Sequence, residues 1–262
     1  MSGSETPSDP SSGPSIRRAH MATFPARAES LPQAVASLAP QVDELHLVLN
    51  EHDGVPEWLD RHPNVIPVLP ERDVKALGKF YPRPGADDRV FLVDDDLIYA
   101  PDYCDVLEAE ARRLGWEGRV FGVHGSILAE RRILFWTRRR RLFHYAKPLR
   151  HSLYVDQLGT GTMLVLGRDL PAHDELPGGE TMADARYARW CHDHGLDRVA
   201  VARRRGLIRT IRVEGPSIYS RHNAHLPPRL VQEQARFAGQ SPRIGKRVEP
   251  LGASGPQGLA PS

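Results

Sequence analysis

The stretch RVFLVDDDLIYAPDY at residues 89–103 decides how the rest of the chain is interpreted. Its first five residues are apolar apart from Arg89, which is typical of a central strand covered on both faces. Asp94, Asp95 and Asp96 follow at once, and carboxylates at the end of a buried strand are costly unless cations meet them. If the strand geometry persists, Asp94 and Asp96 point to one side and Asp95 to the other.

This pattern favours a divalent metal ion. Asp94 and Asp96 can converge on Mg²⁺ or Mn²⁺, hard cations that prefer oxygen ligands and often complete their shell with substrate phosphates. The alternative is a solvated acidic turn before a helix that Asp102 caps, where negative charge suits the helix dipole. Haloacid-dehalogenase-like phosphatases also carry such clusters, but Ile98 stands where their motif needs Thr or Val, and the cluster lies in mid-chain.

Strand and helix patterns alternate along the chain. We predict strands near residues 20–24, 44–49, 65–69, 89–93, 120–123 and 162–166. We predict helices after Ser30, in a capping box with Gln33, then after Asp102, and from about Met182 to His194. Such alternation indicates an α/β fold with a mainly parallel open sheet, in which ligands bind at the carboxyl ends of the strands.

Length and composition suit one globular domain. The chain has 262 residues with 40% hydrophobic and 26% charged content, enough for one full core. Residues 1–15 and 240–262 are rich in Ser, Pro and Gly and are predicted to be disordered tails around a domain at 16–239. No stretch approaches the roughly 20 apolar residues that cross a bilayer. With two cysteines and no secretory pattern at the N-terminus, a cytoplasmic protein is expected.

The order of several motifs resembles a known family. ATFPAR, GKFY, VDDDLIYAPDY, LGTGTM and ADARYARWCHDHG follow one another between about residues 18 and 225. In this order they resemble bacterial family-2-like glycosyltransferases of the GT-A fold, closest to those that act on capsular or other surface polysaccharides. The resemblance implies a GT-A-like, Rossmann-type open twisted sheet with helices on both faces. It also implies metal-dependent, inverting transfer from a nucleoside-diphosphate sugar to a hydroxyl of a saccharide or lipid-linked acceptor.

The resemblance further implies which residues contact the donor nucleotide. The positions that match are Thr23, Pro25 and Arg27 at the first strand–helix turn, Asn50 at the end of the second strand, and Lys79 in GKFY. Many relatives carry an aspartate at the position of Asn50, and Asp53 is a nearby alternative. The alternatives without a binding role are that Arg27 is an exposed arginine at a helix start and that Lys79 is a solvated lysine.

The same resemblance assigns the metal ligands. Asp94 and Asp96 match the outer positions of the DxD motif, which binds metal and the donor diphosphate or ribose. Asp95, between them, is expected to contact the donor together with Asp94. Asp96 is the first choice for direct ligation of Mn²⁺ or Mg²⁺. His222, near His225, matches a late histidine that many relatives supply to the metal, and a surface histidine is the alternative.

The catalytic base is expected at Asp184, the position that serves this role in inverting relatives. Thr181-x-x-Asp184 is also a capping-box pattern, so Asp184 could instead reach back to the helix N-terminus. Glu180 is the reserve candidate. The Gly-Thr-Gly-Thr sequence at 159–162 would line the acceptor side, or would simply form a tight turn.

Arginines crowd two short segments, although the net charge is only +2. Residues 135–143 combine aromatic side chains with four arginines, which suits peripheral contact with an anionic membrane, an acidic acceptor such as a lipid-linked diphosphate sugar, or a solvated loop. Arg203, Arg204 and Arg205 could lie near the donor phosphates or on the surface. No nucleic-acid-binding fold pattern accompanies these arginines.

Two other functions fit part of the pattern. A nucleotidyltransferase shares the α/β architecture and the metal-binding acids, but it needs a Gly-rich basic loop where this chain has FPARAES at 24–30. A non-catalytic module that binds a nucleotide sugar without transferring it is the other alternative, because Asn50 and Ala183 depart from the pattern of relatives.

Overall fold

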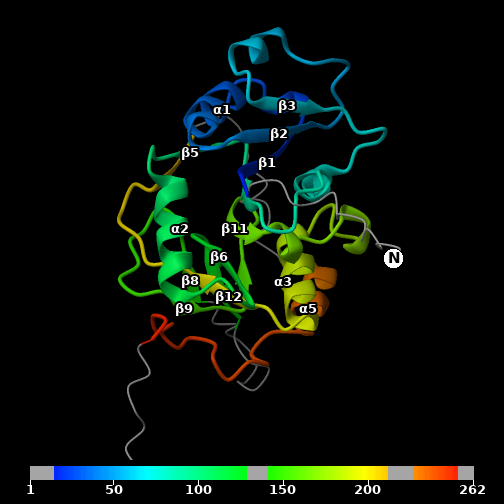
Figure 1. Cartoon of the computed structure of the whole chain (residues 1–262). Helices are drawn as coiled ribbons and strands as arrows, with labels where there is room; N and C mark the ends of the chain where they lie inside the picture. The colour runs from blue at the N-terminus through cyan, green and yellow to red at the C-terminus, as the bar shows by residue number, and fades with distance from the viewer. Residues whose placement is uncertain (1–14, 129–140, 212–226, 253–262) are drawn as a thin grey trace, which may run out of the picture.

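The computed structural model describes residues 15–128, 141–211 and 227–252 (Figure 1). Its centre is an eight-stranded sheet in the order β3-β2-β1-β4-β11-β6-β12-β9. The bounds are Arg17–Thr23 (β1), Glu44–Leu49 (β2), Val65–Val68 (β3), Arg89–Val93 (β4), Arg119–Gly122 (β6), Leu153–Tyr154 (β9), Thr162–Leu166 (β11) and Asp197–Ala200 (β12).

The sheet is mostly parallel, as the alternation of strands and helices predicts. Strands β3, β2, β1 and β4 pair in parallel, and β12 pairs in parallel with β6. The exceptions are β11, antiparallel between β4 and β6, and β9, antiparallel to β12. The open α/β class is therefore confirmed.

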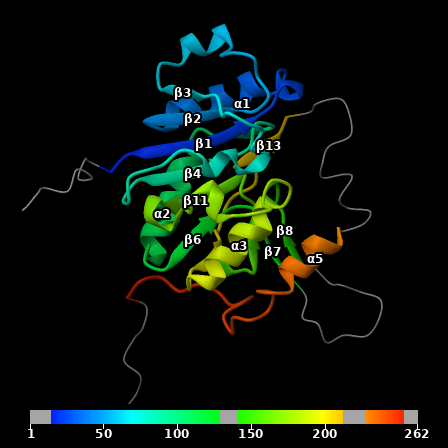
Figure 2. The ribbon, with the colours of Figure 1, turned by 90° about the vertical axis from the view of Figure 1, so that its right-hand side faces the viewer.

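Helices cover both faces of the sheet (Figures 1 and 2). The helices are Leu31–Leu38 (α1), Tyr103–Leu114 (α2), Ala183–Asp193 (α3) and Pro228–Gln234 (α5), and a short 3-10 segment at Lys75–Phe80 (η4) packs near α3. Phe91 and Val93 of β4 join the core under α1 and α2, whereas Val90 and Leu92 join the core under α3 and η4. Burial on both faces explains why β4 reads as a continuous apolar run.

The strand bounds at 44–49, 89–93 and 162–166 are confirmed, but β1 begins earlier than predicted. It starts at Arg17, and the two arginines that hide its start in the sequence are held by acids. Arg17 bonds Glu108 at 2.7 Å and Arg18 bonds Asp88 at 2.7 Å. Charged residues can begin a buried strand when such partners meet them.

Two predicted helix caps are wrong. The Ser30 hydroxyl donates to the carbonyl of Arg27 at 3.2 Å and makes no side-chain cap of α1, so the capping box with Gln33 does not form. Asp102 occupies the N-cap position of α2, but its carboxylate pairs with Arg204 at 2.5 Å rather than with the helix backbone. In both places a longer-range or turn contact displaces the local one.

The folded domain extends beyond the predicted boundary at residue 239. Val248 is 1% exposed, and its N–H donates to Ser152 at 2.9 Å. The Tyr154 N–H donates to the Lys246 carbonyl at 3.1 Å, next to an antiparallel bridge between Leu153 and Arg247. Residues 240–252 therefore belong to the domain, whereas 1–14 and 253–262 lie outside the described residues.

Two small sheets flank the carboxyl ends of the central strands. One joins Gln157–Leu158 (β10), Gly125–Ile127 (β7) and Arg141–Phe143 (β8), and the other joins Leu97–Tyr99 (β5) to Ile208–Thr210 (β13). In Figure 2 the chain enters β1 from the left, so the carboxyl ends of the parallel strands point to the right, toward β13, β7 and β8. No helix in the described ranges is long and apolar enough to cross a membrane.

Candidate functional site

The aspartate run lies at the topological switch point of the sheet. The chain leaves β1 toward β2 and β3 on one side, whereas β4, the other neighbour of β1, leads to strands on the opposite side. Thr23 ends β1, and Asp94 directly follows the end of β4. Open α/β sheets bind ligands in the crevice at such a point.

Asp94 is held between a cation and the backbone of the turn that precedes β11. Its carboxylate forms a close ion pair with the ammonium of Lys79, a side chain of η4 that is only 7% exposed. Its N–H donates to the Tyr99 hydroxyl at 2.7 Å, and that hydroxyl donates to the Gly161 carbonyl at 2.8 Å. A Cβ on Gly161 would overlap the Asp94 carboxylate, so glycine is required for this approach.

Asp95 and Asp96 share the other cation of the site. Arg27 lies 3.1 Å from Asp96 Oδ2 through one terminal nitrogen and 3.7 Å from Asp95 Oδ1 through Nε. Strand geometry does not persist into the run, because β4 ends at Val93 and residues 95 and 96 form a turn. The predicted difference in direction between Asp95 and the other two carboxylates is seen only as a difference in burial. Asp95 is buried, and Asp94 and Asp96 are half-buried.

The carboxylates outnumber the cations that face them. Burial raises the pKa of Asp95 to about 6, against the opposing effects of a hydrogen bond from Thr23 and the charge of Arg27. Burial and the neighbouring Asp94 raise the pKa of Asp96. Burial opposes the charge of Lys79, yet Asp94, Asp184 and Asp95 together raise its pKa. An excess of negative charge in a partly buried cluster favours a further cation.

Three buried polar atoms beside the aspartates make no hydrogen bond of ordinary geometry in the described structure. They are Oγ1 of Thr23, Nε of Arg27 and Oδ2 of Asp95. Thr23 and Arg27 both lie close enough to Asp95 to lower its pKa, so the three atoms face one another. Similar atoms occur elsewhere in the described chain, for example at Arg89 and Tyr103, so these three are compatible with a polar ligand but do not by themselves mark a ligand site. Two of them, Thr23 and Arg27, are residues for which the sequence predicts donor contacts.

Asp184 lies in the first turn of α3 and is fixed by the Gly-Thr-Gly-Thr turn. The N–H and the hydroxyl of Thr160 both donate to Asp184 Oδ1, at 2.8 and 2.7 Å. No side-chain cap forms at α3, so the capping-box alternative with Thr181 is wrong. No described residue donates to the other carboxylate oxygen, which leaves it available to a substrate hydroxyl.

The turn at 159–162 therefore does more than reverse the chain. The Thr162 N–H donates to the Gly159 carbonyl at 3.1 Å, which closes the turn, and the Gly159 N–H donates to the His124 carbonyl at 2.9 Å. The turn brings Thr160 to Asp184 and Gly161 to Asp94. The base candidate and the metal-ligand candidate are in this way held by consecutive residues.

Some predicted site residues play other roles. The Asn50 side chain accepts from Val74 N–H at 3.1 Å and donates to the Lys75 carbonyl at 3.2 Å, so it shapes the segment that leads into η4. Pro25 and Asp53 are exposed, with no side-chain contact to the acids. Glu180 is exposed too, and the contacts of the described chain give it no link to the aspartates. The position predicted to direct the nucleotide base is thus occupied by a structural contact.

His222 and His225 lie outside the described residues, as do residues 135–140 of the basic segment. Within the described ranges no group of three or more His, Cys, Asp or Glu is arranged to hold a metal ion. The described carboxylates alone are an incomplete ligand set. They fit Mg²⁺ or Mn²⁺ only as such ions bind through one or two carboxylates together with substrate phosphates.

Sequence reasoning missed several residues that build the site. The sequence pattern places Tyr99 at an apolar position of a strand. Its hydroxyl links the Asp94 N–H to the Gly161 carbonyl, and this contact can be predicted only if the position of the 159–162 turn is already known. His20 reads as part of β1, but its Nδ1–H donates to the Lys79 carbonyl at 2.9 Å. Burial lowers the pKa of His20 to about 3, so the neutral ring fixes the backbone that carries the lysine.

Comparison with known proteins adds no assignment. No protein-family model matches this sequence. No curated protein matches it either.

Proposed function

We propose that this protein is a metal-dependent, inverting glycosyltransferase of the GT-A type, which moves a sugar from a nucleoside-diphosphate sugar to a hydroxyl acceptor. The observation that carries the proposal is the pairing of two groups at one switch point. A cluster in which carboxylates outnumber cations lies beside a fixed carboxylate, Asp184, whose second oxygen has no described donor. A donor diphosphate and an acceptor hydroxyl are the substrates that such a pair of sites would take.

On the donor side the existing ion pairs can be exchanged. A divalent ion would bind Asp94 and Asp96, and the donor diphosphate would then attract the released Lys79 and Arg27. When bound, the metal would stabilise the negative charge that develops on the leaving diphosphate. The unsatisfied Nε of Arg27 and hydroxyl of Thr23 would find polar partners on the nucleotide.

On the acceptor side Asp184 would act as the general base. The acceptor oxygen forms a bond to the anomeric carbon while the bond from that carbon to the diphosphate breaks, and the hydroxyl proton passes to the free oxygen of Asp184. Thr160 would keep the carboxylate oriented throughout, because both of its donors bind the other oxygen. The products are the glycoside with inverted configuration and the nucleoside diphosphate.

A donor-binding module without transfer is the second candidate. It is favoured by the closed ion pairs of Asp94 and Asp96, which hold both DxD carboxylates on protein cations. The two functions differ in Asp184. Asp184→Asn should stop transfer by an enzyme and should leave a binding module unchanged.

The test is release of nucleoside diphosphate from a panel of uridine, guanosine, cytidine and thymidine diphosphate sugars with Mn²⁺. The wild type should release it from one donor class, and Asp96→Asn should abolish release. Asp102→Asn is the matched control, because Asp102 lies in the same stretch of sequence but pairs with Arg204, away from Arg27 and Lys79. Absence of both turnover and thermal stabilisation with every donor would contradict the proposal.

A cytoplasmic location, at the inner face of the membrane if the acceptor is lipid-linked, belongs to the same proposal. Cys104 and Cys191 are both buried free thiols, and burial raises the pKa of each. Two unpaired thiols suit a reducing compartment.

A further inference from the structure

We propose that the acceptor is an anionic saccharide, bearing carboxylate or phosphate groups, which binds a basic surface formed by residues 141–151 and 203–209. The inference rests on the proposed transferase function and specifies the acceptor of that reaction. Donor recognition does not use this surface.

The basic surface has a large excess of positive charge. Residues 141–155 and 198–211 contain no Asp or Glu. Their exposed cations are Arg141, Lys147, Arg150, Arg204, Arg205 and Arg209. In the part of the chain that the structure describes, Arg204 alone among them has an acidic partner, Asp102. Exposed like charges that lack counter-ions in the protein create a potential that attracts an anion.

The two stretches are joined into one surface by a buried arginine. Leu149 and Arg203 exchange backbone hydrogen bonds of 3.0 and 2.8 Å. The Arg203 guanidinium donates to the carbonyls of Phe143, His144 and Lys147 at 3.2, 3.0 and 3.2 Å. Burial lowers the pKa of Arg203 to about 10, and its guanidinium hydrogen bonds go to backbone carbonyls of the protein and not to a ligand. Arg203 is therefore neither a donor-phosphate contact nor a surface charge, as the sequence had allowed.

The basic surface borders the proposed catalytic site at two points. Tyr145 and Thr210 share a hydroxyl hydrogen bond of 2.7 Å, and the next residue, Ile211, donates its N–H to the Asp96 carbonyl at 2.9 Å. The second point is His124, whose carbonyl binds the Gly159 turn. That turn carries Thr160, the partner of Asp184.

Three rings lie between the cations and the turn. His124, His144 and Tyr145 are half-buried and mutually packed, with centroid distances of 5.3, 5.6 and 4.2 Å. Burial, with Lys147 and Arg203 nearby, lowers the pKa of His144, so this ring is neutral at neutral pH. Neutral ring faces pack against apolar C–H surfaces, which sugar rings present and free phosphate does not. Rings flanked by cations thus fit a charged saccharide.

A lipid surface fits the described residues less well. Peripheral binding to a membrane needs exposed apolar side chains as well as cations. Leu142, at 36% exposed, is the large apolar residue that this surface exposes in the described chain. The half-buried rings, rather than inserted apolar groups, accompany the charges.

The experiment compares three hexasaccharides by isothermal titration: neutral maltohexaose, a phosphorylated maltohexaose and hexagalacturonate. The test variant is Arg205→Glu/Arg209→Glu. The control is Arg61→Glu/Arg236→Glu, which makes the same change in net charge at exposed arginines outside the surface. Vesicles of phosphatidylglycerol and phosphatidylcholine without saccharide form a separate arm. Thermal unfolding verifies that both variants are folded.

The wild type should bind at least one charged hexasaccharide about tenfold more tightly than the neutral one, because its exposed arginines attract the anionic groups. In the test variant these attractions become repulsions. That preference should disappear in the test variant and persist in the control, and the preferred probe identifies carboxylate or phosphate. Equal affinity for charged and neutral probes, equal loss in the control, or stronger binding to vesicles than to any saccharide would overturn the inference. Donor binding by the wild type is measured in parallel, and its absence would count against the transferase function instead.

Discussion

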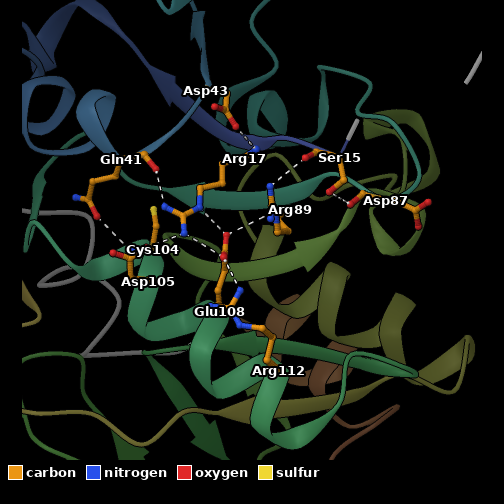
Figure 3. Close-up of polar contacts among 10 residues, drawn as sticks. All are labelled: Ser15, Arg17, Gln41, Asp43, Asp87, Arg89, Cys104, Asp105, Glu108 and Arg112. Atoms are coloured by element: carbon orange, nitrogen blue, oxygen red, sulfur yellow. Dashed lines mark hydrogen bonds and ion pairs between the residues drawn. The ribbon is translucent and has the colours of Figure 1, made fainter. Parts of the chain in front are cut away.

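Two clusters of charge lie at opposite ends of the strands of the same sheet, and they differ in the balance between acids and cations. At the amino ends of β1 and β4, Glu108 is 1% exposed and is surrounded by arginines (Figure 3). Arg17 binds it at 2.7 Å and 3.1 Å, and Arg112 binds it at 3.0 Å. Both of its oxygens are satisfied.

The cluster around Asp95 at the carboxyl ends is different. One oxygen of Asp95 has no hydrogen bond, and the other is 3.7 Å from Arg27. Acids exceed cations there, whereas around Glu108 the arginines are in close contact with the buried acid. The comparison teaches that burial of charge does not mark function by itself. What distinguishes the carboxyl ends of the strands is the excess of acids over cations, since Arg89 beside Glu108 also lacks a hydrogen bond at Nε.

The largest effect is expected at the proposed base. Asp184→Asn keeps an oxygen that can accept from Thr160 but loses the charge that takes the proton. Transfer should fall by a factor of about 10² to 10⁴, with donor affinity unchanged. The measurement is single-turnover transfer alongside donor titration. Asp193→Asn, in the last turn of the same helix, should change neither, and an active Asp184→Asn protein would assign the base elsewhere.

A mutation in the cluster around Glu108, at the amino ends of β1 and β4, should instead change the stability of the fold. Glu108→Gln leaves Arg17 and Arg112 facing a neutral group and should lower the free energy of unfolding by about 3 kcal/mol, as for a broken buried ion pair. Denaturant unfolding measures the change. Donor affinity, measured at a temperature where the variant is folded, should equal that of the wild type. A selective loss of donor affinity would remove the distinction between the two edges.

A smaller effect is expected where the two proposed subsites touch. Gly161→Ala places a methyl group against the Asp94 carboxylate, so stability should fall by about 2 kcal/mol and metal-dependent donor binding should weaken. Gly54→Ala is the control, because a Cβ there meets nothing within 4 Å. Equal behaviour of the two variants in unfolding and donor titration would show that Asp94 is not held by this approach.

The smallest effect is a gain of stability. Because burial raises the pKa of Asp95 to about 6, the native state binds more protons than the unfolded state between roughly pH 4 and 6. Stability from this group therefore falls as pH rises through that window. Asp95→Asn should be more stable than the wild type by about 1 to 2 kcal/mol at pH 8, with the difference vanishing near pH 4. Urea unfolding across this range checks the sign, and a less stable variant at pH 8 would contradict it.

The sequence predicts the elements better than it predicts the contacts between them. The apolar runs of β2, β4 and β11 define their own ends, and the position of the aspartates after β4 follows from the same pattern. The start of β1 is hidden because Arg17 finds its partner, Glu108, 91 residues away. The end of the domain is hidden because residues near Val248 gain order from β9, which composition does not reveal.

The site shows the same limit. Lys79 pairs with Asp94, and Arg27 pairs with Asp96, so the residues that the sequence assigns to one site do lie at the same end of the sheet. The orientation of Asn50 toward η4 and the role of Gly161 depend on loop paths that no local pattern specifies. Local preference is overridden at those positions by tertiary contacts.

The most direct test of the central claim measures Mn²⁺ binding by electron paramagnetic resonance with and without the nucleoside diphosphate that most stabilises the protein. If the carboxyl edge is a shared site for metal and diphosphate, each should tighten the other by about tenfold or more. Asp94→Asn/Asp96→Asn should remove this coupling, and Glu108→Gln should keep it. Coupling that is absent from the wild type, or that survives in the double variant, would contradict the account.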